Sequence, residues 1–483
     1  MITQGVTILC GFIVPKLMIG TFGSEAYGAT SSITQFLAYI TLLEGGIGGV
    51  ARAALYKPLA ENNTERISVV VAELRRFFGI IACIFLVYVL VLAGSFTYIS
   101  DIQAFDRVTT FLLVIVISIS TFAQYFIGIT YAVLLQAAQR LYINNMISVA
   151  ATILNTVMVI ILVKMDCSLL AVKLASSCIF VLRPLVLRMY VRRKFSLIKC
   201  KARDKTVLKQ KWSGLGQHVA YFLHSNTDIM VLTVLADLTL VAVYSVYHMI
   251  ISHIQSFAVS FLAGMEAHFG DMLARKESQE LNKMFSQYET LISLVAVTLF
   301  ATTAILIAPF IELYTAGITD AEYHAPLFAL LMVISCLLYC LRHPYHALVI
   351  AAGHFKQTQI AAYGEAALNV CLSIILVAQY GLIGVAIGTI AATLFRFAYY
   401  VVYLYKHIIY RNVYFFLKRF LLNAGIFASL VWIGKSIIAI IKIDNYIEWT
   451  VGGVITVLVT ALVTVAVNYF FYKKELITLL IKR

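Results

Sequence analysis

The sequence predicts an all-α integral membrane protein with about fourteen transmembrane helices. Of its 483 residues 61% are hydrophobic and only 12% are charged, with a mean hydropathy of +0.91. These values lie far outside the range of soluble globular chains. Apolar stretches long enough to cross a membrane recur along the whole chain, and one of them is repeated in the second half. The net charge of +14 is therefore interpreted as a topology signal rather than as a nucleic-acid footprint.

Each predicted span is an apolar run of about 20 residues, the length that a helix needs to cross roughly 30 Å of hydrocarbon. Polar, charged or glycine residues separate one run from the next. In chain order the predicted spans are 3–22, 29–50, 77–99, 108–136, 146–163, 169–191, 214–235, 241–265, 290–314, 327–350, 360–378, 383–404, 420–441 and 450–472.

The lysines and arginines predict the orientation of these spans. If both termini lie on one side, most cations fall in loops on that side, with the densest group between Arg188 and Lys211. Cytoplasmic loops carry the excess of basic residues, so both termini are expected in the cytoplasm. The outward loops are short, which leaves no room for an external catalytic domain. We therefore expect a protein that is not an enzyme.

An internal repeat predicts two lobes. Residues 154–163 align with 368–377, including Asn155 on Asn369, and nearly the same shift places Arg183 on Arg396. The shift moves an even number of spans, so the two copies have the same orientation and form a parallel pseudo-repeat. We predict an N-terminal six-helix lobe (1–191), a basic cytoplasmic linker (192–213), a C-terminal six-helix lobe (214–404), and an accessory helix pair with a cytoplasmic tail (405–483).

Four cations lie within predicted spans and are candidates for substrate binding: Lys16, Arg183, Arg342 and Arg396. A charge deep in the bilayer costs at least ~2.5–3.5 kcal/mol, so it normally faces a wet cavity or an ionic partner. Arginine binds phosphate oxygens in pairs, whereas lysine acts as a mobile point charge. An anionic head group could therefore be held here. The alternative is an ion pair between helices, with Glu44, Asp228 or Glu365 as the partner.

Acidic and polar residues in the spans are candidates for ion coupling or gating. His224 and Asp228 are four residues apart on one helix face, as are Glu365 and Asn369. Glu44 precedes a run of glycines that favours close packing or bending of the helix. These groups could sense a proton or sodium ion, or could form hydrogen bonds between helices. No metal or other cofactor is expected, because His343 and His346 have no carboxylate or thiol beside them. Pro344 between them predicts a kinked segment that faces a cavity.

Several segments resemble the polysaccharide flippases (Wzx-type, O-antigen and exopolysaccharide) of the multidrug/oligosaccharidyl-lipid/polysaccharide exporter superfamily. They are FGSEAYG at 22–28, LLEGGIG at 42–48, QAAQR at 136–140, Asp228 with YSVY at 244–247, and YGLIGVAIGT at 380–389. The resemblance extends over nearly the whole chain. It implies the MATE-like fold of that superfamily, and it implies a cation site in the second lobe near Asp228, Glu365, Asn369 and Thr393.

The resemblance also implies a function. It implies transfer of an undecaprenyl-pyrophosphate-linked oligosaccharide from the cytoplasmic to the periplasmic leaflet of the bacterial inner membrane by alternating access. This step would supply capsule, O-antigen or exopolysaccharide synthesis, with the polysaccharide polymerase, the chain-length machinery and membrane lipids as partners. Two alternatives stay open. One is a multidrug or small-cation antiporter of the same fold. The other is a membrane enzyme of envelope polysaccharide synthesis, which would need an outward loop or an accessible catalytic histidine.

Overall fold

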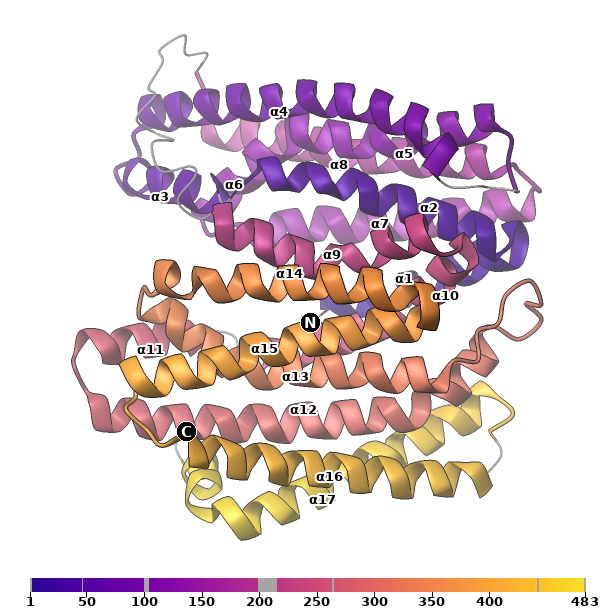
Figure 1. The fold of residues 1–483 in the computed structure, drawn as a ribbon. Helices are drawn as coiled ribbons and strands as arrows, with labels where there is room; N and C mark the ends of the chain where they lie inside the picture. Colours follow the sequence, from indigo (N-terminus) through magenta and orange to yellow (C-terminus); the bar gives the residue numbers. More distant parts are fainter. Residues whose placement is uncertain are drawn as a thin grey trace. The chain divides into compact units, whose positions relative to one another are not determined.

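A computed structural model shows the fold and describes residues 2–45, 47–99, 104–198, 215–262, 265–440 and 443–481 (Figure 1). Within these ranges the secondary structure is helical and contains no strand. The elements are α1 (Ile2–Phe22), α2 (Ser24–Ala38), η1 (Tyr39–Leu43), α3 (Ile47–Ala60), α4 (Thr64–Ile99), α5 (Arg107–Ala123), η2 (Gln124–Gly128), α6 (Ile129–Ala137), α7 (Leu141–Lys164), α8 (Leu169–Phe195), α9 (Leu215–Leu235), α10 (Leu238–Ser260), α11 (Met265–Ala274), α12 (Ser278–Tyr314), α13 (Pro326–Ala351), α14 (Phe355–Tyr380), α15 (Leu382–His407), α16 (Val413–Ile440) and α17 (Tyr446–Ile481).

Twelve helical stretches in the described ranges are long and apolar enough to cross a membrane, and a bent pair raises the number to 13. The predicted all-α membrane architecture is therefore confirmed. The remaining predicted span coincides with α9, which is a helix but does not reach the hydropathy of a span. His218, His224, Asn226 and Asp228 make this helix polar.

The second predicted span is broken. Helix α2 continues into η1, a short 3₁₀ turn, and α3 leaves at an angle of 51°. Gly45, at the break, has a φ of +48°, a left-handed conformation that glycine adopts without a Cβ clash. The glycines that follow Glu44 therefore permit a bend, as the sequence predicts. Irregular backbone at membrane depth is tolerated only where it is buried in protein or lines a wet cavity.

One compact unit comprises Met1–Phe222 with Leu232–Ala242. In this unit α5 packs against α4 and α8, α7 packs against α1 and α8, and α3 packs against α4 and α6. Phe78, Phe85 and Phe96 lie fully buried along one side of α4. The predicted basic linker begins as the last turn of α8 with Arg192, and residues 199–214 lie outside the described part of the chain.

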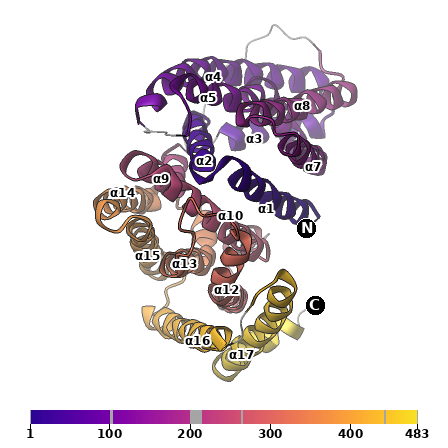
Figure 2. The same cartoon turned by 90° about the vertical axis from the view of Figure 1, so that its right-hand side faces the viewer.

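The second compact unit comprises Leu223–Val231 with Val243–Arg483, so α9 is divided between the two units. Helix α15 packs between α14 and α13, α13 packs in turn against α12, and both α16 and α17 pack against α12 (Figure 2). Helix α12 is the most enclosed of the described spans, with 67% of its apolar window buried. The last two helices are thus attached to this unit through α12.

Helices α14 and α15 approach each other closely because α15 has glycine where they meet. A Cβ atom on Gly384 would lie 2.4 Å from the Leu376 carbonyl oxygen, and one on Gly388 would lie 2.7 Å from Ser373 Oγ. Small residues four apart allow membrane helices to pack backbone against backbone. This contact brings the polar residues of α14 next to those of α15.

Candidate functional site

Four polar side chains from four helices meet in the second unit, in what we call the Glu365 cluster. Glu365 on α14 accepts hydrogen bonds from Arg342 on α13 and Arg396 on α15, one at each carboxylate oxygen. His224 Nε2 on α9 lies 3.6 Å from Glu365 Oε1. Glu365 is 0% exposed, and the two arginines are 5% and 3% exposed. The sequence predicts all four as site residues, and the structure brings them together.

The ion pairs of this cluster correspond to the alternative that the sequence left open for two of the arginines. Arg342 and Arg396 do not face an open cavity in this conformation, because both are enclosed and paired with Glu365. Removing one member of a buried ion pair is strongly destabilising, by about 3–5 kcal/mol, since the other charge stays buried without a partner. The ion pairs of the cluster therefore link α13, α14 and α15, and they also keep charged groups inside this unit.

One helical turn further along α9 and α14 lies a second group, the Asp228 cluster. Tyr244 Oη donates to Asp228 Oδ2 over 2.9 Å, and Thr389 Oγ1 lies 3.1 Å from the same oxygen. Asn369 Nδ2 donates to Thr389 Oγ1 over 3.0 Å. The hydrogen bonds between helices that the sequence left open for Asp228 and Asn369 are thus formed. Thr393, which the resemblance places near this site, donates instead to the Thr389 carbonyl oxygen of its own helix.

The Asp228 cluster has the chemistry of a site for a small hard cation. Asp228 is 6% exposed, and among the described residues no lysine or arginine pairs with it. Asn369 Oδ1 is buried and lacks a hydrogen-bond partner in the described structure. Carboxylate, amide and hydroxyl oxygens are the ligands that hard cations prefer, and a carboxylate also accepts a proton. These oxygens could therefore hold a coupling ion.

In the first unit, Glu44 lies where two irregular backbone segments meet. Tyr125, in the π-helical turn η2 that interrupts the fourth predicted span, has its Oη 3.5 Å from Glu44 Oε2. His218 Nε2 lies 3.0 Å from the carbonyl oxygen of Thr41, three residues before Glu44. Single π-helical turns inside helices frequently mark functional sites. The sequence does not predict the contact between Tyr125 and Glu44, because hydropathy does not detect a π-helical turn. It also does not predict the contact of His218 with the Thr41 carbonyl oxygen.

The other two predicted cations, Lys16 on α1 and Arg183 on α8, also lie in the first unit. Both are half-buried. The Nε of Arg183 is buried and has no hydrogen-bond partner among the described residues. Pro184, the next residue, packs against η2 at Gly128. The structure thus groups Arg342 with Arg396 and places Lys16 and Arg183 in the other unit.

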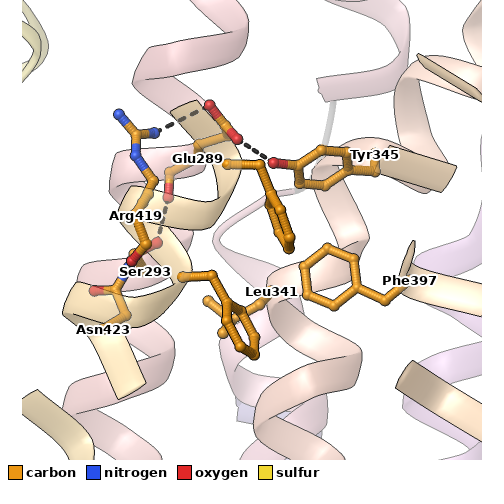
Figure 3. A pocket seen from close by; sticks show the side chains of 9 residues that line it. Glu289, Ser293, Leu341, Tyr345, Phe397, Arg419 and Asn423 are labelled. Carbon is orange, nitrogen blue, oxygen red and sulfur yellow. Dashed lines mark hydrogen bonds and ion pairs between the residues drawn. The ribbon is translucent and has the colours of Figure 1, made fainter. Parts of the chain in front are cut away.

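The sequence does not predict a third polar group, the Glu289 cluster, of which Figure 3 shows Glu289, Tyr345 and Arg419. Glu289 on α12 accepts hydrogen bonds from Tyr345 on α13 and, over 3.1 Å each, from Arg411, just before α16, and Arg419 on α16. Both arginines precede the predicted span 420–441, so the sequence predicts that they lie in a cytoplasmic loop. The available signal was Glu289 itself, an acidic residue directly before an apolar run.

Comparisons with known proteins identify the fold. No protein-family model matches the chain, and no curated protein matches its sequence. Among solved structures, the chain is similar to the lipid II flippase MurJ in an inward closed conformation, with a TM-score of 0.72 and 14% identity over 98% of this chain and 99% of that one.

Two multidrug transporters are also similar. One is an inward-facing MATE family transporter of the MOP superfamily, with a TM-score of 0.57 and 14% identity over 82% of this chain and 94% of that one. The other is the MATE multidrug transporter DinF-BH, with a TM-score of 0.57 and 18% identity over 85% of this chain and 94% of that one. The chain therefore has the helical membrane-transporter fold that MurJ and the MATE transporters of the MOP superfamily share.

Proposed function

We propose that this protein is a flippase that moves an undecaprenyl-pyrophosphate-linked oligosaccharide from the cytoplasmic to the periplasmic leaflet of a bacterial inner membrane. One observation carries the proposal: the fold of a lipid flippase matches this chain over its whole length, whereas the two MATE structures cover 82% and 85% of it. In this proposal the prenyl tail lies against the accessory helices α16 and α17.

The intramembrane cations support an anionic lipid as the substrate. Guanidinium groups bind diphosphate oxygens in pairs, and a charge within a bilayer is costly unless it has an ionic partner, a wet cavity or a charged ligand. Arg342, Arg396, Arg183 and Lys16 would bind the diphosphate in successive states of an alternating-access cycle. The flipped lipid would supply a surface polysaccharide, with the polymerase and chain-length machinery acting on it afterwards.

The Asp228 cluster supports ion coupling of this transport. A buried carboxylate without a basic partner must bind a proton or a cation, or bear the desolvation of a bare charge. We propose that Asp228, Asn369 and Thr389 bind the coupling proton or sodium ion in the second unit. Glu44 would play the corresponding part in the first unit.

A multidrug or small-cation antiporter is the second candidate, and the Asp228 cluster is also the observation that favours it. An organic cation would be attracted to a buried acidic group, and the fold is that of MATE transporters as well. The buried arginines oppose this function, because they would repel a cationic substrate. The two candidates therefore differ in the sign of the charge that the substrate carries.

Complementation tests the proposed function. The gene is expressed in a strain that lacks its own polysaccharide flippase, and surface glycan is measured. We expect glycan to be restored, and we expect no gain of resistance to cationic drugs in a strain that lacks its drug exporters. Drug resistance without surface glycan would contradict the flippase function and support the antiporter function.

A further inference from the structure

The Glu365 cluster has more positive than negative charge. One carboxylate pairs with two guanidinium groups, and all three residues are at most 5% exposed. His224, the fourth member, is 7% exposed, and its Nδ1 has no hydrogen-bond partner among the described residues. An excess cation in a low-dielectric interior is unfavourable unless another anion joins it. The cluster is therefore short of one anion.

Arg342 has unused hydrogen-bonding capacity. A guanidinium carries five N–H donors in a planar fork. Among the described residues, Arg342 donates only to Glu365, and its remaining contact is with the Tyr339 ring, whose centroid lies 5.0 Å from Cζ. Arg396 is better satisfied, since its Nε and its second terminal nitrogen both donate to Tyr400 Oη. A further anion would thus find its free donors on Arg342.

The Glu289 cluster has the same ratio of charges as the Glu365 cluster, but its arginines have further hydrogen-bond partners. Glu289 also pairs with two arginines, but Arg411 donates in addition to Ser286 Oγ and Arg419 to the Ser286 carbonyl oxygen. The Arg411 side chain is 17% exposed, so water solvates part of its charge. The Glu365 and Glu289 clusters each pair one carboxylate with two arginines. Both arginines of the Glu289 cluster have a further hydrogen-bond acceptor, whereas Arg342 of the Glu365 cluster has none among the described residues.

We propose that Glu365 is an internal counter-anion, which occupies Arg342 and Arg396 until the diphosphate of the substrate displaces it. Each arginine binds one oxygen of a single carboxylate, the arrangement in which two oxygens of a phosphate would bind. The proposal rests on the proposed function and deepens it. Glu365 holds the arginines in place without substrate and weakens the affinity for the anion, so that the diphosphate can be released on the far side of the membrane.

Inorganic pyrophosphate tests this displacement. The purified full-length protein in detergent is titrated with pyrophosphate, and with sulfate at equal ionic strength, while thermal unfolding is followed. A ligand that binds only the folded state raises the unfolding temperature in proportion to its affinity. Glu365→Gln removes the competing anion, so we expect its pyrophosphate dissociation constant to fall by roughly tenfold or more, the scale of one buried charge pair.

Two controls separate displacement from a general gain of positive charge. Glu289→Gln removes another buried carboxylate that pairs with two arginines, and it is expected to leave the affinity for pyrophosphate unchanged. In Arg342→Gln combined with Glu365→Gln, the gain is expected to disappear. Wild-type affinity in Glu365→Gln, or an equal gain in Glu289→Gln, would overturn the proposal. If Glu365→Gln does not fold, Glu365→Asp decides, since its shorter carboxylate should give a smaller gain and no gain would contradict displacement.

The same variants separate this inference from the proposed function. If the wild type restores surface glycan but Glu365→Gln or Glu365→Asp binds pyrophosphate no better, the displacement is wrong and the flippase function stands. If the affinity rises as expected but the wild type restores no glycan, the arginines bind an anion and the flippase function is wrong.

Discussion

At the scale of single residues, the buried arginines and Arg183 have different surroundings and should respond differently to truncation. Arg342 is enclosed and paired with Glu365, whereas Arg183 is half-buried and its Nε lacks a partner among the described residues. Arg342 is therefore expected to contribute to stability as well as to binding of the anion, whereas Arg183 is expected to contribute mainly to binding.

We predict that Arg342→Ala destabilises the protein by about 1.5–3 kcal/mol, because Glu365 loses one charged hydrogen bond but stays paired with Arg396. Arg183→Ala should leave the unfolding temperature near that of the wild type and still abolish surface glycan in the complementation assay. Thermal unfolding in detergent and glycan staining are measured together. Full complementation by Arg183→Ala would remove Arg183 from the substrate site.

A second prediction concerns Asp228. Asp228→Asn keeps the shape and the hydrogen bond from Tyr244 but removes the charge that would hold a coupling ion. Transport by this variant should no longer respond to a sodium or proton gradient across proteoliposomes. Asp237→Asn is the matched control, since Asp237 is exposed and only accepts a hydrogen bond from the Thr239 backbone. Unaltered gradient dependence in Asp228→Asn would place the coupling ion elsewhere.

At the scale of helices, the sequence predicts most spans because an apolar run of about 20 residues matches the thickness of a bilayer and is rare in soluble chains. It also gives Glu365, together with Glu44 and Asp228, as a possible ionic partner of the intramembrane arginines, and the structure shows that Glu365 is the partner of Arg342 and Arg396. It does not predict the π-helical turn at Tyr125 or the Glu289 cluster. A π turn leaves hydropathy unchanged, and the pairing of Glu289 with Arg419 depends on how α12 and α16 pack. The composition of one segment does not indicate which distant segment it contacts in the fold.

The glycines of α15 give a prediction at this scale. Gly388→Ala places a Cβ atom 2.7 Å from Ser373 Oγ and 3.0 Å from the Ser373 nitrogen, so α15 must move away from α14. We expect a loss of about 1–3 kcal/mol of stability and loss of transport, since Asn369 and Thr389 separate. Gly425→Ala on α16 meets no atom within 4 Å and should be neutral or slightly stabilising. Equal effects of the two substitutions would contradict this account of the packing.

At the scale of the whole molecule, the protein combines a transporter fold with buried positive charge. Two compact units, each with polar groups within its helices, fit alternating access, in which a substrate site is exposed first to one side of the membrane and then to the other. The arginines favour an anionic substrate. The fold does not identify that substrate, because a lipid flippase and multidrug transporters share it.

The most direct test reconstitutes the purified protein into liposomes that contain a fluorescent polyprenyl-pyrophosphate oligosaccharide. A quencher outside the vesicles reports which leaflet holds the lipid. We predict that the protein exposes inner-leaflet lipid to the quencher, and that Arg183→Ala abolishes this transfer. The flippase function would be contradicted if quenching were no greater than in protein-free liposomes and the same protein took up a fluorescent organic cation.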